Sequence, residues 1–251
     1  MPSLAFLRLG CNNSCRVLCN PFDMPPIPQI IHQIWIGPRA RPTIWMQTIQ
    51  DFAVAFGWMY MLWDDTAIAA LDMRNRALFD REPSYHGKAD IARLEILIAH
   101  GGAYIDADSV VTKPAQLDSL LRSFDAEVGF GWENSWLIAN GTILACAGSP
   151  FLAACRDEMP LRNAALMPWQ KYGPQLVTDL YHRHKASLDI TLYEPTVFYP
   201  IKWHGIRDVE LHKKIELPPQ SCMFQYGYST NSLEAQVAAA SEAAASAPAQ
   251  I

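Results

Sequence analysis

Short β-rich segments and helix-like segments alternate along the first half of the chain. Residues 29–36 are β-rich and end at a Gly-Pro pair, which predicts a buried strand that stops at a turn. Residues 42–56 place apolar side chains at helical spacing, with Thr43 as the expected cap. A second strand is expected over residues 58–63 and a second helix over residues 66–73. This order is typical of an α/β domain, which we therefore expect.

A helix, a glycine pair and a short strand then lead into an acidic motif. Apolar side chains at helical spacing predict a helix over residues 88–100, and the glycines at 101–102 provide a stop where positive φ angles cost little. A strand over residues 103–105 ends at Asp106 and Asp108. Because side chains alternate along an extended chain, both carboxylates are expected to point to the same side.

This acidic pair favours a divalent cation. Two carboxylates at the end of a buried strand repel each other and are costly to desolvate unless a proton or a cation lies between them. Oxygen ligands suit Mg²⁺ or Mn²⁺, and a site that supplies one or two carboxylates leaves positions for substrate phosphates. A solvated acidic turn is the alternative interpretation of the same pattern.

Two charged residues on the preceding helix bear on that choice. Asp90 and Arg93 are three residues apart and therefore share one helical face. Arg93 is suited to bind a phosphate or sugar hydroxyls, and Asp90 to accept hydrogen bonds from hydroxyls. The alternative is an exposed ion pair, with Glu95 as a further partner.

Length and composition indicate one globular domain with short additions. The chain has 251 residues, 50% of them hydrophobic, and a net charge of -5, which excludes disorder of the whole chain and disfavours nucleic acid as a partner. We expect an N-terminal extension (1–26), one globular domain (27–232) and an Ala/Ser-rich tail (233–251), either a frayed helix or a flexible segment. No integral membrane segment and no secretory signal are expected, which favours a cytoplasmic location.

Three segments, in this order, resemble the glycosyltransferases with a DxD sugar-binding region. They are IPQIIHQIWIG at 27–37, KADIAR at 88–93 and HGGAYIDAD at 100–108. That family includes yeast initiating mannosyltransferases, capsular polysaccharide enzymes and, more distantly, the glucosylating clostridial toxins. The resemblance implies a glycosyltransferase-A fold, a Rossmann-like, mostly parallel sheet flanked by helices. It also implies that a hexose is transferred from a UDP- or GDP-sugar to a glycan or other hydroxyl acceptor, with retention of configuration.

The resemblance also implies roles for individual residues. Asp106, Asp108 and Arg93 would be catalytic, and Asp108 would bind Mn²⁺ or Mg²⁺ directly while Asp106 contacts the metal or the sugar. Trp35 would stack on the nucleotide base, although plain core packing is an alternative for this aromatic residue. The residues that would hold the nucleotide-sugar are Trp35, Ile36, Asp90, Arg93, Asp106 and Ala107.

One later segment departs from the family pattern. The family commonly shows a His, then three residues, then Ser-Trp near the end of the domain. The corresponding stretch here places Gln225 where the His is expected and Thr230 in place of the Trp. We expect Gln225 and Ser229 as further metal ligands, because amide and hydroxyl oxygens can bind a hard cation.

Alternatives remain for the mechanism and for the function. The cation and Arg93 would offset the charge on the leaving diphosphate while the acceptor attacks from the same face. Glu133 is the nearby candidate for a carboxylate nucleophile; otherwise Glu133 and Asn134 shape the acceptor or sugar pocket, or only a surface loop. A degenerate sugar-binding domain without turnover is one other function. A metal-dependent phosphohydrolase, which needs more acidic or His ligands, is another.

Overall fold

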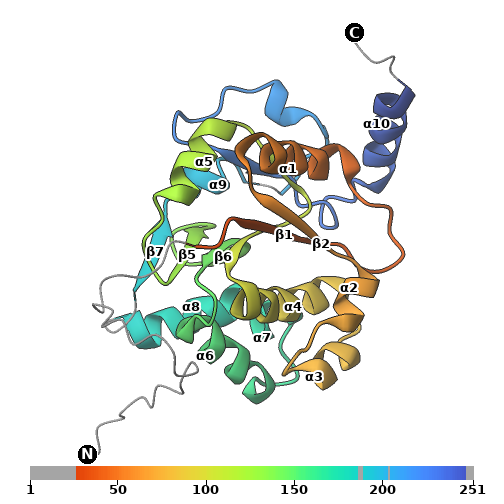
Figure 1. Cartoon of the computed structure of the whole chain (residues 1–251). Coiled ribbons are helices and arrows are strands. Elements are labelled where there is room, and N and C mark those ends of the chain that lie inside the picture. The colour runs from red at the N-terminus through yellow and green to blue at the C-terminus, as the bar shows by residue number, and fades with distance from the viewer. Residues whose placement is uncertain (1–26, 186–188, 203, 247–251) are drawn as a thin grey trace, which may run out of the picture.

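A six-stranded sheet forms the centre of the molecule (Figure 1). The structure is a computed structural model that describes residues 27–185, 189–202 and 204–246, so the extension expected over residues 1–26 lies outside the described residues. The strand order is β2-β1-β3-β6-β5-β7, and β6 alone runs against its neighbours, which makes the sheet mostly parallel, as predicted. The strands are β1 (Ile30–Ile34), β2 (Met59–Trp63), β3 (Gly102–Ile105), β5 (Val128–Trp132), β6 (Ile138–Ala145) and β7 (Ile190–Tyr193).

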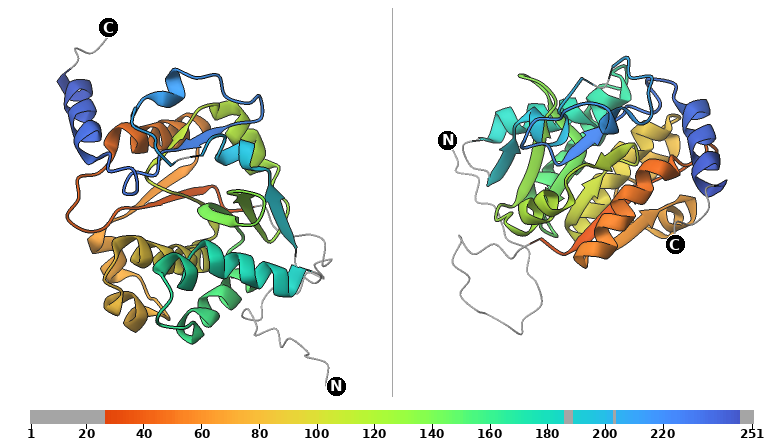
Figure 2. Two further views of the ribbon diagram at one scale, coloured as in Figure 1. Left: turned by 180° about the vertical axis from the view of Figure 1, so that it is seen from behind. Right: turned by 90° about the horizontal axis from the view of Figure 1, so that it is seen from above.

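Helices cover both faces of this sheet (Figures 1 and 2), and a buried apolar cluster lies on each face. One layer contains α2 (Asp65–Ala70), α3 (Arg76–Arg81), α4 (Tyr85–His100), α6 (Pro150–Glu158), α7 (Pro168–Lys171) and α8 (Pro174–His184). The other contains α1 (Thr43–Phe56), α5 (Pro114–Arg122) and α9 (Pro195–Phe198). Two short strands, β4 (Ser109–Val111) and β8 (Met223–Gln225), form a separate antiparallel pair. Short 3₁₀ helices are η1 (Met159–Leu161) and η3 (Leu211–Lys213).

The starts of the helices differ from the sequence expectation for local reasons. Thr43 does not cap α1, because it lies inside the helix and its hydroxyl donates to Ser241 Oγ at 3.0 Å. Helix α2 begins one residue early, since the side chain of Asp64 accepts a hydrogen bond from the Ala67 N–H at 3.0 Å. Helix α4 begins at Tyr85, three residues before the expected start, after a cap by Ser84.

The glycine pair after α4 is required by its backbone conformation. Gly101 and Gly102 have φ angles of 63° and 95°, a region that other residues rarely adopt. A Cβ on Gly102 would also lie 2.5 Å from the Ile30 carbonyl oxygen of the neighbouring strand. The pair therefore lets α4 end and β3 enter the sheet directly beside β1.

The segment expected as a tail contains a further helix, α10 (Glu234–Ser246), which lies beside α1 (Figure 2). Leu233 and Val237 are buried in an apolar cluster together with Trp45 of α1. Among the residues that the structure describes, no helix has the length and apolar character needed to cross a bilayer. The cytoplasmic location expected from the sequence stays a prediction.

Candidate active site

The acidic motif lies at the carboxyl edge of the central sheet. Asp106 follows β3, and its N–H donates to the Gly141 carbonyl of the antiparallel strand β6 at 2.7 Å. The chain then turns through Asp108 into β4, which pairs with β8 in a register that sets Ser109 opposite Gln225. This pairing brings a segment from the end of the domain next to the acidic motif.

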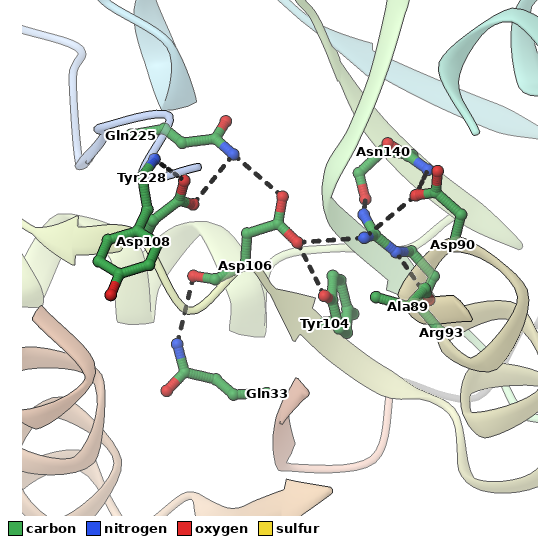
Figure 3. A network of polar contacts seen from close by, with 10 residues as sticks. All are labelled: Gln33, Ala89, Asp90, Arg93, Tyr104, Asp106, Asp108, Asn140, Gln225 and Tyr228. Carbon is green, nitrogen blue, oxygen red and sulfur yellow. Dashed lines mark hydrogen bonds and ion pairs between the residues drawn. The ribbon is translucent and has the colours of Figure 1, made fainter. Parts of the chain in front are cut away.

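Gln225 contacts both carboxylates of the motif (Figure 3). Its Nε2 donates to Asp106 Oδ2 at 3.0 Å and to Asp108 Oδ1 at 3.2 Å. The second oxygen of Asp108 accepts the backbone N–H of Tyr228 at 2.8 Å. Asp106, Asp108 and Gln225, which the sequence places in one site, are thus within contact distance of each other.

The pKa of Asp108 is raised from 3.8 to about 6. Burial is the main cause, and the negative charge of Asp106 adds to it. The hydrogen bonds from the Tyr228 N–H and from Gln225 act in the opposite direction but do not cancel the shift. The ionised motif is therefore costly without a further positive charge.

Arg93 connects Asp106 to Asp90 (Figure 3). Its NH2 atom lies 3.1 Å from Asp90 Oδ1 and 3.3 Å from Asp106 Oδ1, and its NH1 donates to the Asn140 carbonyl at 2.5 Å. The side chains of Arg93 and Asp90 are only 6% and 8% exposed, so the alternative interpretation of an exposed ion pair is wrong. Glu95 is not part of this network; it accepts the N–H of Asn75 at 2.9 Å.

Tyr104 and Asn140 complete the network, and sequence reasoning gave neither of them a role. The Tyr104 hydroxyl donates to Asp106 Oδ1 at 2.7 Å, and its ring lies 4.6 Å from the Arg93 guanidinium. The Asn140 amide donates to Asp90 Oδ1 at 2.8 Å. The available signals were the alternation of β3, which puts residue 104 on the side of residue 106, and the Asn-Gly pair at 140–141.

The donor set fits a hard divalent cation. Asp90 and Asp106 pair with the single guanidinium of Arg93, and Asp108 is linked to Asp106 through Gln225. When all three carboxylates are ionised, three negative charges less one positive charge leave two negative charges. A Cβ on Gly141 would lie 2.7 Å from Asp106 Oδ2, so the absence of a side chain there keeps the space beside the carboxylates open. Across the described ranges, no cluster of three or more His, Cys, Asp or Glu side chains has metal-binding geometry. Phosphate oxygens would have to complete the coordination.

The expected nucleotide-binding residues follow β1 and β3. Trp35 is half-buried; its indole N–H donates to the Arg39 carbonyl at 2.9 Å, and its ring meets Tyr228 edge-on with centroids 5.4 Å apart. Ile36 and Ala107 are buried. The Ser229 hydroxyl is exposed and accepts a hydrogen bond from Arg39 at 3.1 Å, rather than from a residue of the acidic motif.

Asn134 lies at a hollow elsewhere along the same edge of the sheet. Its side-chain oxygen accepts the backbone N–H groups of Trp136 and Leu137 at 3.0 and 3.1 Å, which shapes the turn between β5 and β6. Asn134 also lines a cavity of about 300 Å³. Glu133 is not among the residues that line this cavity.

Comparisons with known proteins show which family the sequence resembles. A sequence profile of the family described as "Glycosyltransferase sugar-binding region containing DXD motif" matches residues 42–126. An uncharacterized glycosyltransferase of Acanthamoeba polyphaga mimivirus is 36% identical over 186 residues, which cover 69% of this chain and 73% of the viral protein. Inositol phosphoceramide mannosyltransferase 1 of Schizosaccharomyces pombe is 31% identical over 133 residues, 47% of this chain. The matched part spans only 40% of that yeast enzyme.

The fold is also found in a solved structure. A glycosyltransferase involved in the glycosylation of the major capsid of PBCV-1 superposes with a TM-score of 0.50 at 13% identity, covering 83% of this chain and all of that one. This likeness supports a glycosyltransferase-A fold, as predicted. The family itself follows from the identity to the viral relative, of which this chain covers 73%, and from the matching profile. This chain belongs to the family of glycosyltransferases with a DXD-containing sugar-binding region.

Proposed function

We propose that this chain is a metal-dependent, retaining glycosyltransferase that moves a hexose from a UDP- or GDP-sugar to a glycan or other hydroxyl acceptor. The observation that carries this proposal is the acidic motif at the carboxyl edge of the sheet, the edge where open α/β sheets bind their ligands. Its carboxylates carry more negative charge than Arg93 balances. A divalent cation together with a diphosphate would complete such a site.

Asp108, Asp106 and Gln225 are the residues that would hold Mn²⁺ or Mg²⁺. The cation, when bound, supplies positive charge that offsets the charge developing on the leaving diphosphate. Gln225 would present its amide oxygen instead of its N–H₂ group, which requires only a half-turn of the terminal amide. The Tyr228 N–H holds the Asp108 carboxylate in one orientation throughout.

Arg93 and Asp90 would hold hydroxyl groups of the transferred sugar or of the ribose. The guanidinium of Arg93 is fixed by its bonds to Asp90, Asp106 and the Asn140 carbonyl, so it loses little freedom when it binds a ligand. Trp35 would face the nucleotide base, with Ile36 and Ala107 beside it. The leaving phosphate oxygen would take the proton of the attacking hydroxyl, a route that needs no nucleophile from the protein.

A second candidate is a domain that binds a nucleotide-sugar without turnover. The observation that favours it is the amide of Gln225, which donates to both carboxylates at the position where the family commonly has His. Both candidates bind the donor, and they differ in whether a hexose leaves it. A binding measurement and a transfer measurement on the same sample therefore separate them.

Calorimetry with UDP-glucose, UDP-galactose and GDP-mannose, with and without Mn²⁺, tests the proposal. We expect Mn²⁺-dependent binding of one donor, its loss in Asp108→Asn, and wild-type binding in the control Asp51→Asn, whose side chain is exposed on α1. Methyl hexosides and myo-inositol then serve as acceptors in a transfer assay, the latter because of the name of the yeast relative. Equal donor binding by wild type and Asp108→Asn would contradict the proposed site.

A further inference from the structure

A cavity lies at the carboxyl edge of the sheet, where β5 and β7 end. These strands are parallel neighbours (Figure 1), and Gly131 is the register partner of Tyr193. The chain therefore leaves both strands side by side, at Trp132 and at Glu194. The hollow between the two exits has a volume of about 300 Å³ and is lined by Trp132, Asn134, Ser135, Glu194 and Pro195.

Several polar groups of this cavity are available to a ligand. Within the part of the chain that the structure describes, the Glu194 carboxylate, the Ser135 hydroxyl and the Trp132 indole N–H have no hydrogen-bond or ion-pair partner. The turn at Asn134 uses only its side-chain oxygen, which leaves the N–H₂ group available. The ring of Trp132 packs edge-on against Tyr181 of α8, at an interplanar angle of 89° and with centroids 6.1 Å apart.

The chemistry of these groups selects a class of ligand. An aromatic ring beside a carboxylate, an amide and a hydroxyl matches a compact ligand with an apolar ring face and several hydroxyl donors. No Lys or Arg lines the cavity, and Glu194 would repel an anion. A neutral sugar fits these groups, whereas a phosphate or a nucleotide does not.

The position of the cavity relates it to the acidic motif. Strands β3 and β5 are separated by β6 alone. Ile105 at the end of β3 pairs with Thr142, whereas Trp132 at the end of β5 pairs with Ile138, so β5 ends four residues further along β6 and the two strand ends lie about 16 Å apart. The edge between them is occupied by the start of β6, where Asn140 contacts Arg93 and Asp90. A donor hexose held by Arg93 would therefore lie between the acidic motif and this cavity.

We infer that the Trp132–Glu194 cavity, defined by the five residues above, binds one neutral hexopyranose ring of the acceptor. The inference rests on the proposed function, because it names the substrate class at the acceptor side of that site. The volume is at the lower end of ligand pockets, which suits a single sugar ring. Glu194 accepts hydroxyl donors of that ring, and Trp132 covers its apolar face.

Saturation-transfer NMR on the full chain tests this inference with four probes: lactose and the methyl glycosides of glucose, galactose and mannose. At least one probe should bind with a dissociation constant below about 20 mM and shift the Trp132 indole N–H signal, identified by its loss in Trp132→Phe. Trp132→Phe and Glu194→Gln should each weaken that probe by about tenfold or more. Trp136→Phe is the matched control, since Trp136 is exposed in the same turn and does not line the cavity.

The outcomes separate this inference from the proposed function. Absence of binding by all four probes, or an equal loss in Trp136→Phe, overturns the inference. Glu194 is exposed, so Glu194→Gln keeps the test decisive even where Trp132→Phe fails to fold. Donor binding with Mn²⁺ is measured on the same samples and should stay within about twofold of wild type in both variants. Probe binding without donor binding contradicts the proposed function alone, whereas donor binding without probe binding contradicts the cavity alone.

Discussion

Replacing Asp108 by Asn should stabilise the metal-free protein while it removes metal-dependent donor binding. Burial and then the charge of Asp106 raise the pKa of Asp108 from 3.8 to about 6. The folded state therefore binds this proton more tightly than the unfolded chain does. The resulting stabilisation is fully present below pH 3.8 and is lost as the pH rises through 6, so the ionised carboxylate opposes folding at neutral pH.

The size of the effect follows from the pKa shift. A shift of about two pH units corresponds to about 3 kcal/mol of unfolding free energy at pH 7. Asn has the shape of Asp, and its oxygen can still accept the Tyr228 N–H, but its N–H₂ group then faces the Gln225 N–H₂ group that donates to Asp108 Oδ1 in the wild type. We therefore expect only part of this energy to be recovered. For a chain of this length, a gain of about 1 to 2 kcal/mol raises the melting temperature by about 2 to 8 °C.

Urea unfolding in EDTA at pH 7 and at pH 4 measures the difference in unfolding free energy between Asp108→Asn and the wild type. Asp51→Asn is the exposed control. Asp108→Asn should be more stable than wild type at pH 7, and the difference should shrink to near zero at pH 4. With Mn²⁺ and a bound nucleotide, the wild type should become more stable than Asp108→Asn, because only the wild type gains binding energy. A variant less stable than wild type at pH 7 without metal would refute the reasoning from unbalanced charge.

Three further predictions concern Gly141, Arg93 and His32, a buried residue of β1. Gly141→Ala should weaken Mn²⁺-dependent donor binding by about tenfold or more in calorimetry, because its Cβ would lie 2.7 Å from Asp106 Oδ2; unchanged affinity would contradict this. Arg93→Met should lower the unfolding free energy by about 3 to 5 kcal/mol in urea titrations, since it leaves buried carboxylates unpaired, and a loss below about 1 kcal/mol would argue against the network. Burial lowers the pKa of His32 from 6.5 to about 4, so protonation should cost wild type up to about 3 kcal/mol as the pH falls from 6.5 to 4. His32→Gln should lack that loss, and an identical pH dependence of the two proteins would disprove it.

The fold could be predicted largely from local patterns. Alternating strands and helices over residues 29–105 gave the α/β class, because side-chain periodicity and turn residues act over short distances. The glycines at 101–102 marked the passage from α4 to β3 correctly. Thr43 was a wrong cap prediction, since its hydroxyl is bound by Ser241 of a helix almost two hundred residues later. Such a contact has no local signature.

In the candidate site too, local features could be predicted from the sequence, whereas contacts between distant residues could not. The motif around Asp106 and Asp108 and the Asp90–Arg93 spacing were visible in the sequence. The burial of Arg93 and its bond to the Asn140 carbonyl were not, because they depend on how β6 packs against β3. The Tyr228 contact to Asp108 uses a backbone N–H, a group that every residue except proline carries and that residue type cannot reveal.

Anomalous diffraction from crystals grown with Mn²⁺ and UDP or GDP tests the central claim most directly. We expect one strong manganese peak at about 2.2 Å from a carboxylate oxygen of Asp108, with the amide oxygen of Gln225 turned toward the metal. The diphosphate oxygens should occupy the remaining positions, and Asp108→Asn crystals should lack the peak. A manganese peak elsewhere, or a nucleotide bound with the Gln225 N–H₂ group still on both carboxylates, would contradict it.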